Sequence, residues 1–216
     1  MKETYENLNW WLANLDKQKL PEYSKLPEVN LYMEQVVSFV AESVKPFSND
    51  NNCDLTSFMV NNYVKAKIIE PPNDRKYNRD HITHLIALSM LKSVTNLEDL
   101  SLILDSKTSM MTPEDSYNFF KKTTEDSITN VLHKTKVRVD TINKKADTDR
   151  NKAKKNQEKI KKIDGVQKNQ LIYSAFRLLV ESEINKMVAD KILSEVRVDH
   201  SSLKKTSAKA PTKKDK

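Results

Sequence analysis

Residues 55–104 read LTSFMVNNYVKAKIIEPPNDRKYNRDHITHLIALSMLKSVTNLEDLSLIL, and this stretch decides the fold. Its first part predicts an amphipathic helix over residues 55–67, with Asp54 or Thr56 as the N-cap. The apolar side of that helix carries Leu55, Met59, Val60, Tyr63 and Ala66. The polar side carries Ser57, Asn61, Asn62 and Lys65. The pattern therefore predicts one buried face and one face that is open to a partner.

A short basic hairpin is predicted after this helix. Residues 68–69 form an apolar pair, residues 71–74 form a turn, and residues 75–77 return from that turn. Two more helices follow, one capped by Asp80 and one that begins at Asn96. A helix, a basic wing and two further helices are the parts of a winged helix-turn-helix, in which polar side chains enter a DNA groove. The predicted fold class is therefore mostly α with a small wing.

Further helices are predicted on both sides of this region. Residues 1–27 hold an N-terminal helix over 4–19 and a linker that Pro21 and Pro27 punctuate, and a second helix covers 28–45. The winged domain is expected to span residues 28–111, with a loop at 47–54.

A helical extension is predicted over residues 112–199. It starts at Thr112, where a hydroxyl, a proline and two acids form a strong N-terminal signal, and its first helix reaches residue 132. Residues 134–168 carry 13 basic and 5 acidic side chains, which fits either an exposed basic helix or a disordered linker. Residues 170–196 predict an amphipathic helix, and residues 200–216 predict a disordered basic tail.

The composition excludes several classes of function. The chain has one glycine, Gly165, whereas phosphate-cradling nucleotide loops need several. Its one cysteine, Cys53, cannot form an intramolecular disulfide or a cysteine-based zinc site. No apolar run approaches the length of a membrane span and no leader precedes the first helix, so we expect a soluble cytoplasmic protein.

The net charge of +7 is unevenly distributed. Residues 1–111 hold 12 Lys and Arg against 15 Asp and Glu, whereas residues 112–216 hold 25 against 15. Residues 61–92 nevertheless hold six basic and three acidic side chains, so the charge around the predicted wing is positive. This local excess is more informative about nucleic acid than the total charge is.

Three short motifs carry a resemblance to a known family: residues 31–36 (LYMEQV), residues 59–65 (MVNNYVK) and residues 76–77 (KY). With their surroundings, they closely resemble the bacterial domain of unknown function 1836 over roughly residues 20–110. The family name supplies no activity, but at least one member is a transcriptional repressor. The resemblance therefore implies a DNA-binding regulator.

The same region is similar, at one remove, to MerR regulators. Their recognition helix reads Thr-Leu-Arg-Tyr-Tyr-Glu-x-x-Gly-Leu-Ile before an Arg-containing wing, and residues 59–69 occupy those places here. Tyr63 and the closing apolar pair match, whereas Asn61, Asn62 and Lys67 replace the arginine, the first tyrosine and the glycine. The likeness implies the fold, but the base contacts of that family do not carry over.

The DNA-binding prediction rests on two kinds of side chain. Asparagine amides can pair with adenine in the major groove, and cations at the helix end and wing can meet phosphates. The predicted contact residues are Ser57, Asn61, Asn62, Lys65, Lys67, Arg75, Lys76 and Arg79. The alternative interpretation is that these residues are ordinary exposed polar side chains in a chain rich in Asn and Lys. Tyr77 is expected to pack the wing on the core.

Other candidate sites are weaker. His81 and His84 lack a convincing third and fourth metal ligand, and two surface histidines explain them better. Trp10, Trp11 and the Phe119–Phe120 pair fit a core or dimer interface better than an effector pocket, so a small-molecule effector stays undecided. No catalytic motif stands out, so we expect neither an enzyme nor a cofactor.

The sequence thus predicts a transcriptional regulator, preferentially a repressor, that binds double-stranded DNA. Helix 56–67 would enter the major groove, and a homodimer would form through residues 114–132 or 170–196. Two alternatives stay open. In the first, the winged domain binds a partner protein. In the second, the basic segment 134–168 and the tail bind DNA without sequence preference, as nucleoid proteins do.

Overall fold

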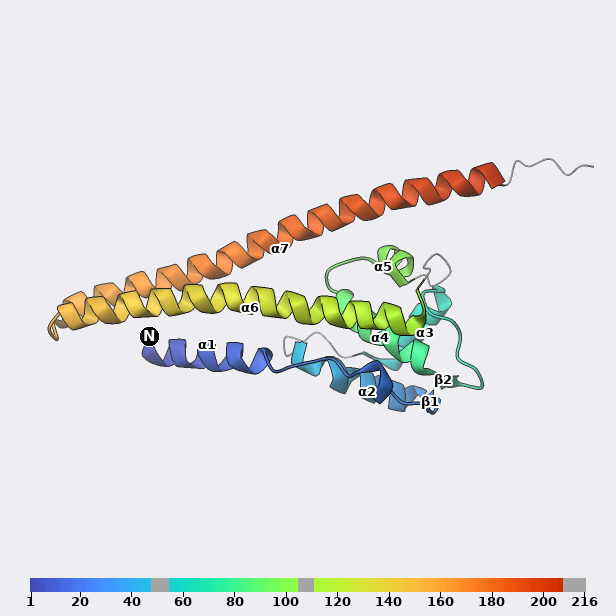
Figure 1. Cartoon of the computed structure of the whole chain (residues 1–216), viewed down its shortest axis with the longest axis horizontal. Helices are drawn as coiled ribbons and strands as arrows, with labels where there is room; N and C mark the ends of the chain where they lie inside the picture. The colour runs from blue at the N-terminus through green and yellow to red at the C-terminus, as the bar shows by residue number, and fades with distance from the viewer. Residues whose placement is uncertain (48–54, 105–110, 208–216) are drawn as a thin grey trace, which may run out of the picture. The chain divides into compact units, whose positions relative to one another are not determined.

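The computed structural model describes residues 1–47, 55–104 and 111–207, and side chains up to residue 197 (Figure 1). Asp54, Cys53 and the tail residues 208–216 lie outside the described residues. The chain divides into two units, Met1–Lys168 and Asn169–Lys216. The predicted mostly helical class is confirmed.

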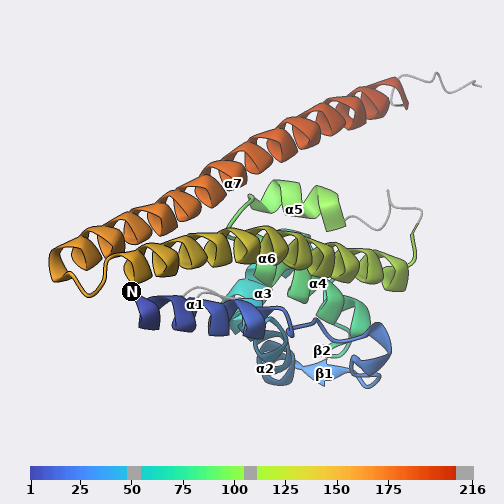
Figure 2. The ribbon, with the colours of Figure 1, turned by 60° about the vertical axis from the view of Figure 1, so that its left-hand side comes forward.

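The first unit is built from helices and one two-stranded sheet. In chain order its elements are α1 (Lys2–Leu15), η1 (Tyr23–Lys25), β1 (Leu31–Tyr32), α2 (Met33–Val44), η2 (Lys45–Phe47), α3 (Ser57–Lys65), β2 (Lys76–Tyr77), α4 (Arg79–Leu91), α5 (Leu97–Leu104), α6 (Pro113–Lys152) and the start of α7 (Gln157–Ser207). Figure 2 shows α1 running along α6, with α2 and the strands below it. The remainder of α7 forms the second unit.

Helix α4 is the centre of the core. Eight of its residues are buried, and Ile82, Leu85 and Leu88 are fully inaccessible. It packs on α2, whose Val36, Val40 and Val44 are also inaccessible and recur every four residues on one face. The prediction of Asp80 as the cap of α4 is wrong. The cap is Asn78, two residues earlier, whose side chain accepts a hydrogen bond from the His81 amide at 3.1 Å.

The predicted hairpin is wrong in its pairing. Residues 68–69 are not a strand: Ile68 and Ile69 are buried in the core directly after α3. Strand β2 pairs instead with β1, antiparallel, with Leu31 opposite Tyr77 and Tyr32 opposite Lys76. The predicted helix over 28–45 accordingly starts at Met33, because the two residues before it form β1.

Helix α6 begins at the core and extends beyond it, and its part from residue 132 to residue 152 is here called the arm. It begins as predicted, with the Thr112 hydroxyl accepting from the Asp115 amide at 3.1 Å, but it continues to Lys152. Its buried residues beyond the core alternate at spacings of three and four, which is the repeat of a helix–helix seam. They are Leu132, Thr135, Val139, Ile142 and Ala146. Tyr5 of α1 donates to Asp140 of α6 at 2.8 Å and holds α1 against the arm.

The open question about residues 134–168 is settled in favour of helix. After α6, residues 153–156 turn, and α7 begins with the Asn156 side chain accepting from the Lys159 amide. Across this turn, the Arg150 guanidinium pairs with Asp164 at 2.7 Å and also contacts Gln167, which is buried. The buried amide of Gln167 donates to Asn143 at 3.0 Å, so both ends of this side-chain amide have a partner.

In the second unit, helix α7 carries an exposed apolar row. The predicted helix over 170–196 is confirmed, and α7 continues to Ser207. Apolar side chains recur every four residues and are each between 41% and 63% exposed. They are Ile172, Phe176, Val180, Ile184, Val188, Ile192 and Val196.

Candidate nucleic-acid interface

Helix α3 separates its apolar and polar faces cleanly. Thr56 caps it, since its hydroxyl accepts from the Met59 amide at 3.2 Å. Val60 and Tyr63 are buried against the core, and burial raises the pKa of the Tyr63 hydroxyl. On the opposite side Ser57, Asn61 and Lys65 are exposed and Asn62 is half-buried. The side chains predicted to read bases therefore lie on an accessible face that a packed face holds in place.

Phe58 is a residue of this face that sequence reasoning missed. It is 73% exposed, and with Asn61, Asn62 and Lys65 it occupies positions i, i+3, i+4 and i+7 of α3. An exposed phenyl ring costs solvation free energy unless a partner covers it. The signal was available in the sequence, because Phe58 is out of phase with the buried Val60 and Tyr63.

The turn between α3 and β2 presents a basic tip. Asp74 and Arg75 have φ of 48° and 61°, and the Lys76 amide donates to the Asn73 carbonyl at 2.8 Å. Two successive positive φ angles inside a two-residue hairpin loop are what a type I′ turn requires. Arg75 occupies the second central position and is exposed. The guanidinium of Arg75 therefore extends into solvent from the tip of a two-residue hairpin loop.

His81 fixes the segment that carries this turn. Its ring accepts from the Asn78 amide through Nδ1 at 3.1 Å, and its Nε2 is 3.1 Å from the Glu70 carbonyl, to which it donates in that tautomer. Tyr77 is buried as predicted, and its ring packs edge-on against the imidazole. Because His81 is itself 8% exposed, it is a structural residue and not the surface histidine that the sequence suggested.

Two predicted contact residues are engaged within the protein. The Lys76 ammonium lies 5.1 Å from the centre of the Tyr32 ring, across the sheet. The Arg79 guanidinium donates to the Leu26 carbonyl at 3.2 Å and lies 3.4 Å from a Glu28 oxygen. It also stacks on the Tyr23 ring at 5.0 Å, so Arg79 ties α4 to η1 and is not grouped with the α3 face.

Lys67 ends α3 in a strained backbone conformation. The Lys67 amide donates to Val64 and the Ile68 amide donates to Tyr63, which together form a Schellman motif with Lys67 at φ 58°. Glycine is the residue that this position favours, and Lys67 stands where the MerR-like pattern has its glycine. The motif turns the chain so that Ile68 and Ile69 enter the core.

Lys67→Gly is expected to stabilise the fold by about 1 kcal/mol, because glycine adopts the left-handed conformation without a Cβ clash. Urea unfolding followed by circular dichroism measures the change. The matched control is Lys65→Gly in the last turn of the same helix, which is expected to cost about 1 kcal/mol. Equal destabilisation by both substitutions would contradict the Schellman ending.

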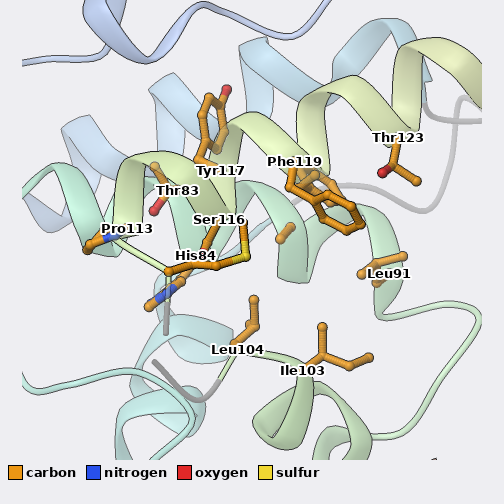
Figure 3. A pocket seen from close by; sticks show the side chains of 13 residues that line it. Thr83, His84, Leu91, Ile103, Leu104, Pro113, Ser116, Tyr117, Phe119 and Thr123 are labelled. Atoms are coloured by element: carbon orange, nitrogen blue, oxygen red, sulfur yellow. The ribbon is translucent and has the colours of Figure 1, made fainter. Parts of the chain in front are cut away.

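His84 lies away from this interface, on the side of α4 that faces α5 and α6 (Figure 3). Burial lowers the pKa of its imidazole, and the nearby Asp80 carboxylate only partly opposes that effect. Among the described residues, no three His, Cys, Asp or Glu side chains form a group that could hold a metal ion.

Comparison with known proteins finds one match for part of this chain. Residues 21–125 match the family described as Domain of unknown function (DUF1836). The matched range contains β1 to α5 and the first turns of α6. No curated protein and no solved structure matches the chain. In the part of the chain that the structure describes, no helix combines the length and apolar character that a membrane span needs.

Proposed function

We propose that this protein is a sequence-specific DNA-binding transcriptional regulator, preferentially a repressor, that acts in the cytoplasm. The exposed polar face of α3 is the observation that carries the proposal. A helix with that face outward and Val60 and Tyr63 buried has the architecture of a recognition helix, with α2 as the preceding helix of a helix-turn-helix. The small sheet and its turn take the place of a MerR-like wing.

In this proposal α3 enters the major groove and the turn contacts the neighbouring backbone. The amide of Asn61 presents a donor and an acceptor that match adenine, and Phe58 offers an apolar surface for a thymine methyl group. Lys65, Lys67 and Arg75 are the exposed cations for phosphates. Only residues 66–72 separate α3 from the turn, and Ile68 and Ile69 are buried within that link, so both elements are held to one core.

We further propose that the protein acts as a homodimer. Two-fold DNA sites pair with two-fold proteins, and the exposed apolar row of α7 supplies a surface that pairing of two copies would cover.

Genome-wide enrichment of DNA by the purified protein at near-physiological salt tests the function. We expect a few sharp sites that share an inverted repeat and that disappear with Asn61→Ala. Thr129→Ala on α6 is the matched control, because it removes an exposed polar side chain far from α3 along the chain and should leave the sites intact. Diffuse enrichment that ignores Asn61→Ala would move the DNA contact to the basic residues of 134–168.

A second function is favoured by one observation, the 73% exposure of Phe58. Aromatic side chains are enriched at the centres of protein–protein interfaces, so the same face of α3 also suits a partner protein. Loss of all DNA enrichment, together with recovery of one stoichiometric protein that Phe58→Ala no longer recovers, would establish this reading.

A further inference from the structure

A cavity of about 300 Å³ lies between α4, α5 and α6, on the side of α4 away from α2 (Figure 3). Helix α4 contributes His84, Ala87 and Leu91, and α5 contributes Ile103 and Leu104. Helix α6 closes it with aromatic side chains, among which Figure 3 shows Phe119 facing the space above Ile103 and Leu104. This volume is at the lower end of the range for small-molecule sites, which suits a compact ligand.

Few polar groups face the cavity, and only some of them already form hydrogen bonds within the protein. The Thr83 hydroxyl donates to the Asp80 carbonyl at 2.8 Å, and the Tyr117 hydroxyl donates to the Pro21 carbonyl at 2.8 Å, so neither has a proton left to donate to a ligand. The side chains of His84 and Ser116 form no hydrogen bond with any residue that the structure describes. Apolar walls with a small number of unused polar groups are typical of a binding site.

We propose that this cavity binds a small, largely apolar molecule, namely a ring system that carries one hydroxyl group, with the hydroxyl bonded to the His84 imidazole. Burial lowers the pKa of His84, which favours the neutral form of the imidazole. A neutral imidazole offers one donor and one acceptor, which suits a hydroxyl better than a carboxylate. The partly exposed Ile103 and Phe119, at 49% and 66%, form the rim through which such a ligand enters.

The site also has a route to the DNA-binding face, and this part rests on the proposed function. Helix α4 lines the cavity with one side, and through His81 it holds the Glu70 carbonyl that follows α3. A ligand that shifts the equilibrium position of α4 therefore shifts α3 and its turn. The size of the change in DNA affinity is limited by how much more tightly the ligand binds one position of α4 than the other.

Binding of 2-naphthol to the full chain, in the absence of DNA, tests the cavity. Ligand-detected NMR and fluorescence titration should give saturable binding with one site per chain. We expect Ser116→Phe, which fills the cavity, to weaken binding at least tenfold, and His84→Leu to weaken it several-fold. Ile184→Ala, in the exposed row of α7, is the control and should leave the affinity unchanged.

Two outcomes would overturn the site: affinity that ignores Ser116→Phe, or affinity that Ile184→Ala abolishes, which would place the probe on α7. If thermal unfolding shows that Ser116→Phe does not fold, Ile103→Lys at the exposed rim replaces it with the same expectation. A DNA titration with and without saturating 2-naphthol tests the coupling separately. A chain that binds the probe but no DNA would overturn the proposed function and leave the cavity assignment standing.

Discussion

Leu85→Ala is expected to lower the free energy of unfolding by about 3–4 kcal/mol. Leu85 lies on α4 and is fully inaccessible, among the side chains that join α4 to α2 and α3 in one cluster. The substitution removes buried methyl groups and leaves a cavity that close-packed neighbours fill only partly. Since a domain of this size is stable by only about 5–15 kcal/mol, the loss is a large share of the total. Urea denaturation, monitored by circular dichroism, gives the value.

Leu97→Ala is the matched control, because it makes the same chemical change on α5 at a side chain that is 45% exposed. Surface substitutions of this kind usually change stability by no more than about 0.5 kcal/mol. A loss of similar size for both variants would mean that α4 is not the centre of the core. Unfolding should be analysed over the first transition, because the two units need not unfold together.

The starts of α3 and α6 were predictable because each has a local cause. Thr56 and Thr112 cap their helices with their own hydroxyl groups, and the apolar phase of residues 55–63 marks the buried face of α3. These signals lie within one or two helical turns of the residue they affect, so one sequence contains them in full.

The sheet was not predictable in the same way. Strands β1 and β2 have two residues each, too few to show an alternating pattern, and they are distant in the chain. The adjacent apolar pair 68–69 therefore gave a better local match for a hairpin strand than the true partner, Leu31–Tyr32. The positive φ angles of Lys67, Asp74 and Arg75 were hidden as well, because no glycine marks them.

The arm of α6 and α7 was left undecided for a different reason. Residues 134–168 bury only one narrow face, and that face includes polar residues such as Thr135 and Gln167. A buried glutamine counts as polar in a sequence pattern, although Arg150 and Asn143 satisfy its amide in the fold. Composition alone cannot distinguish such a helix from a solvated linker.

Arg75→Glu is expected to lower the affinity for specific DNA by tenfold or more and to reduce its salt dependence. The side chain extends from the tip of the type I′ turn, where it is exposed. Removing one phosphate contact decreases the magnitude of the slope of log K against log salt concentration by about 0.9, and the new carboxylate adds repulsion. Titrations of an operator fragment at several salt concentrations measure both quantities.

Lys122→Glu on α6 separates a local contact from net charge. Its side chain is also exposed and the substitution changes the total charge by the same amount, but it lies outside the proposed interface. We expect it to weaken binding far less than Arg75→Glu, because charges beyond about 10 Å are largely screened at 0.1 M salt. Equal losses of DNA affinity from Arg75→Glu and Lys122→Glu would show that the affinity depends on the net charge of the protein and not on a local contact. The turn between Asn73 and Lys76 would then be a structural closure of the sheet and not a wing.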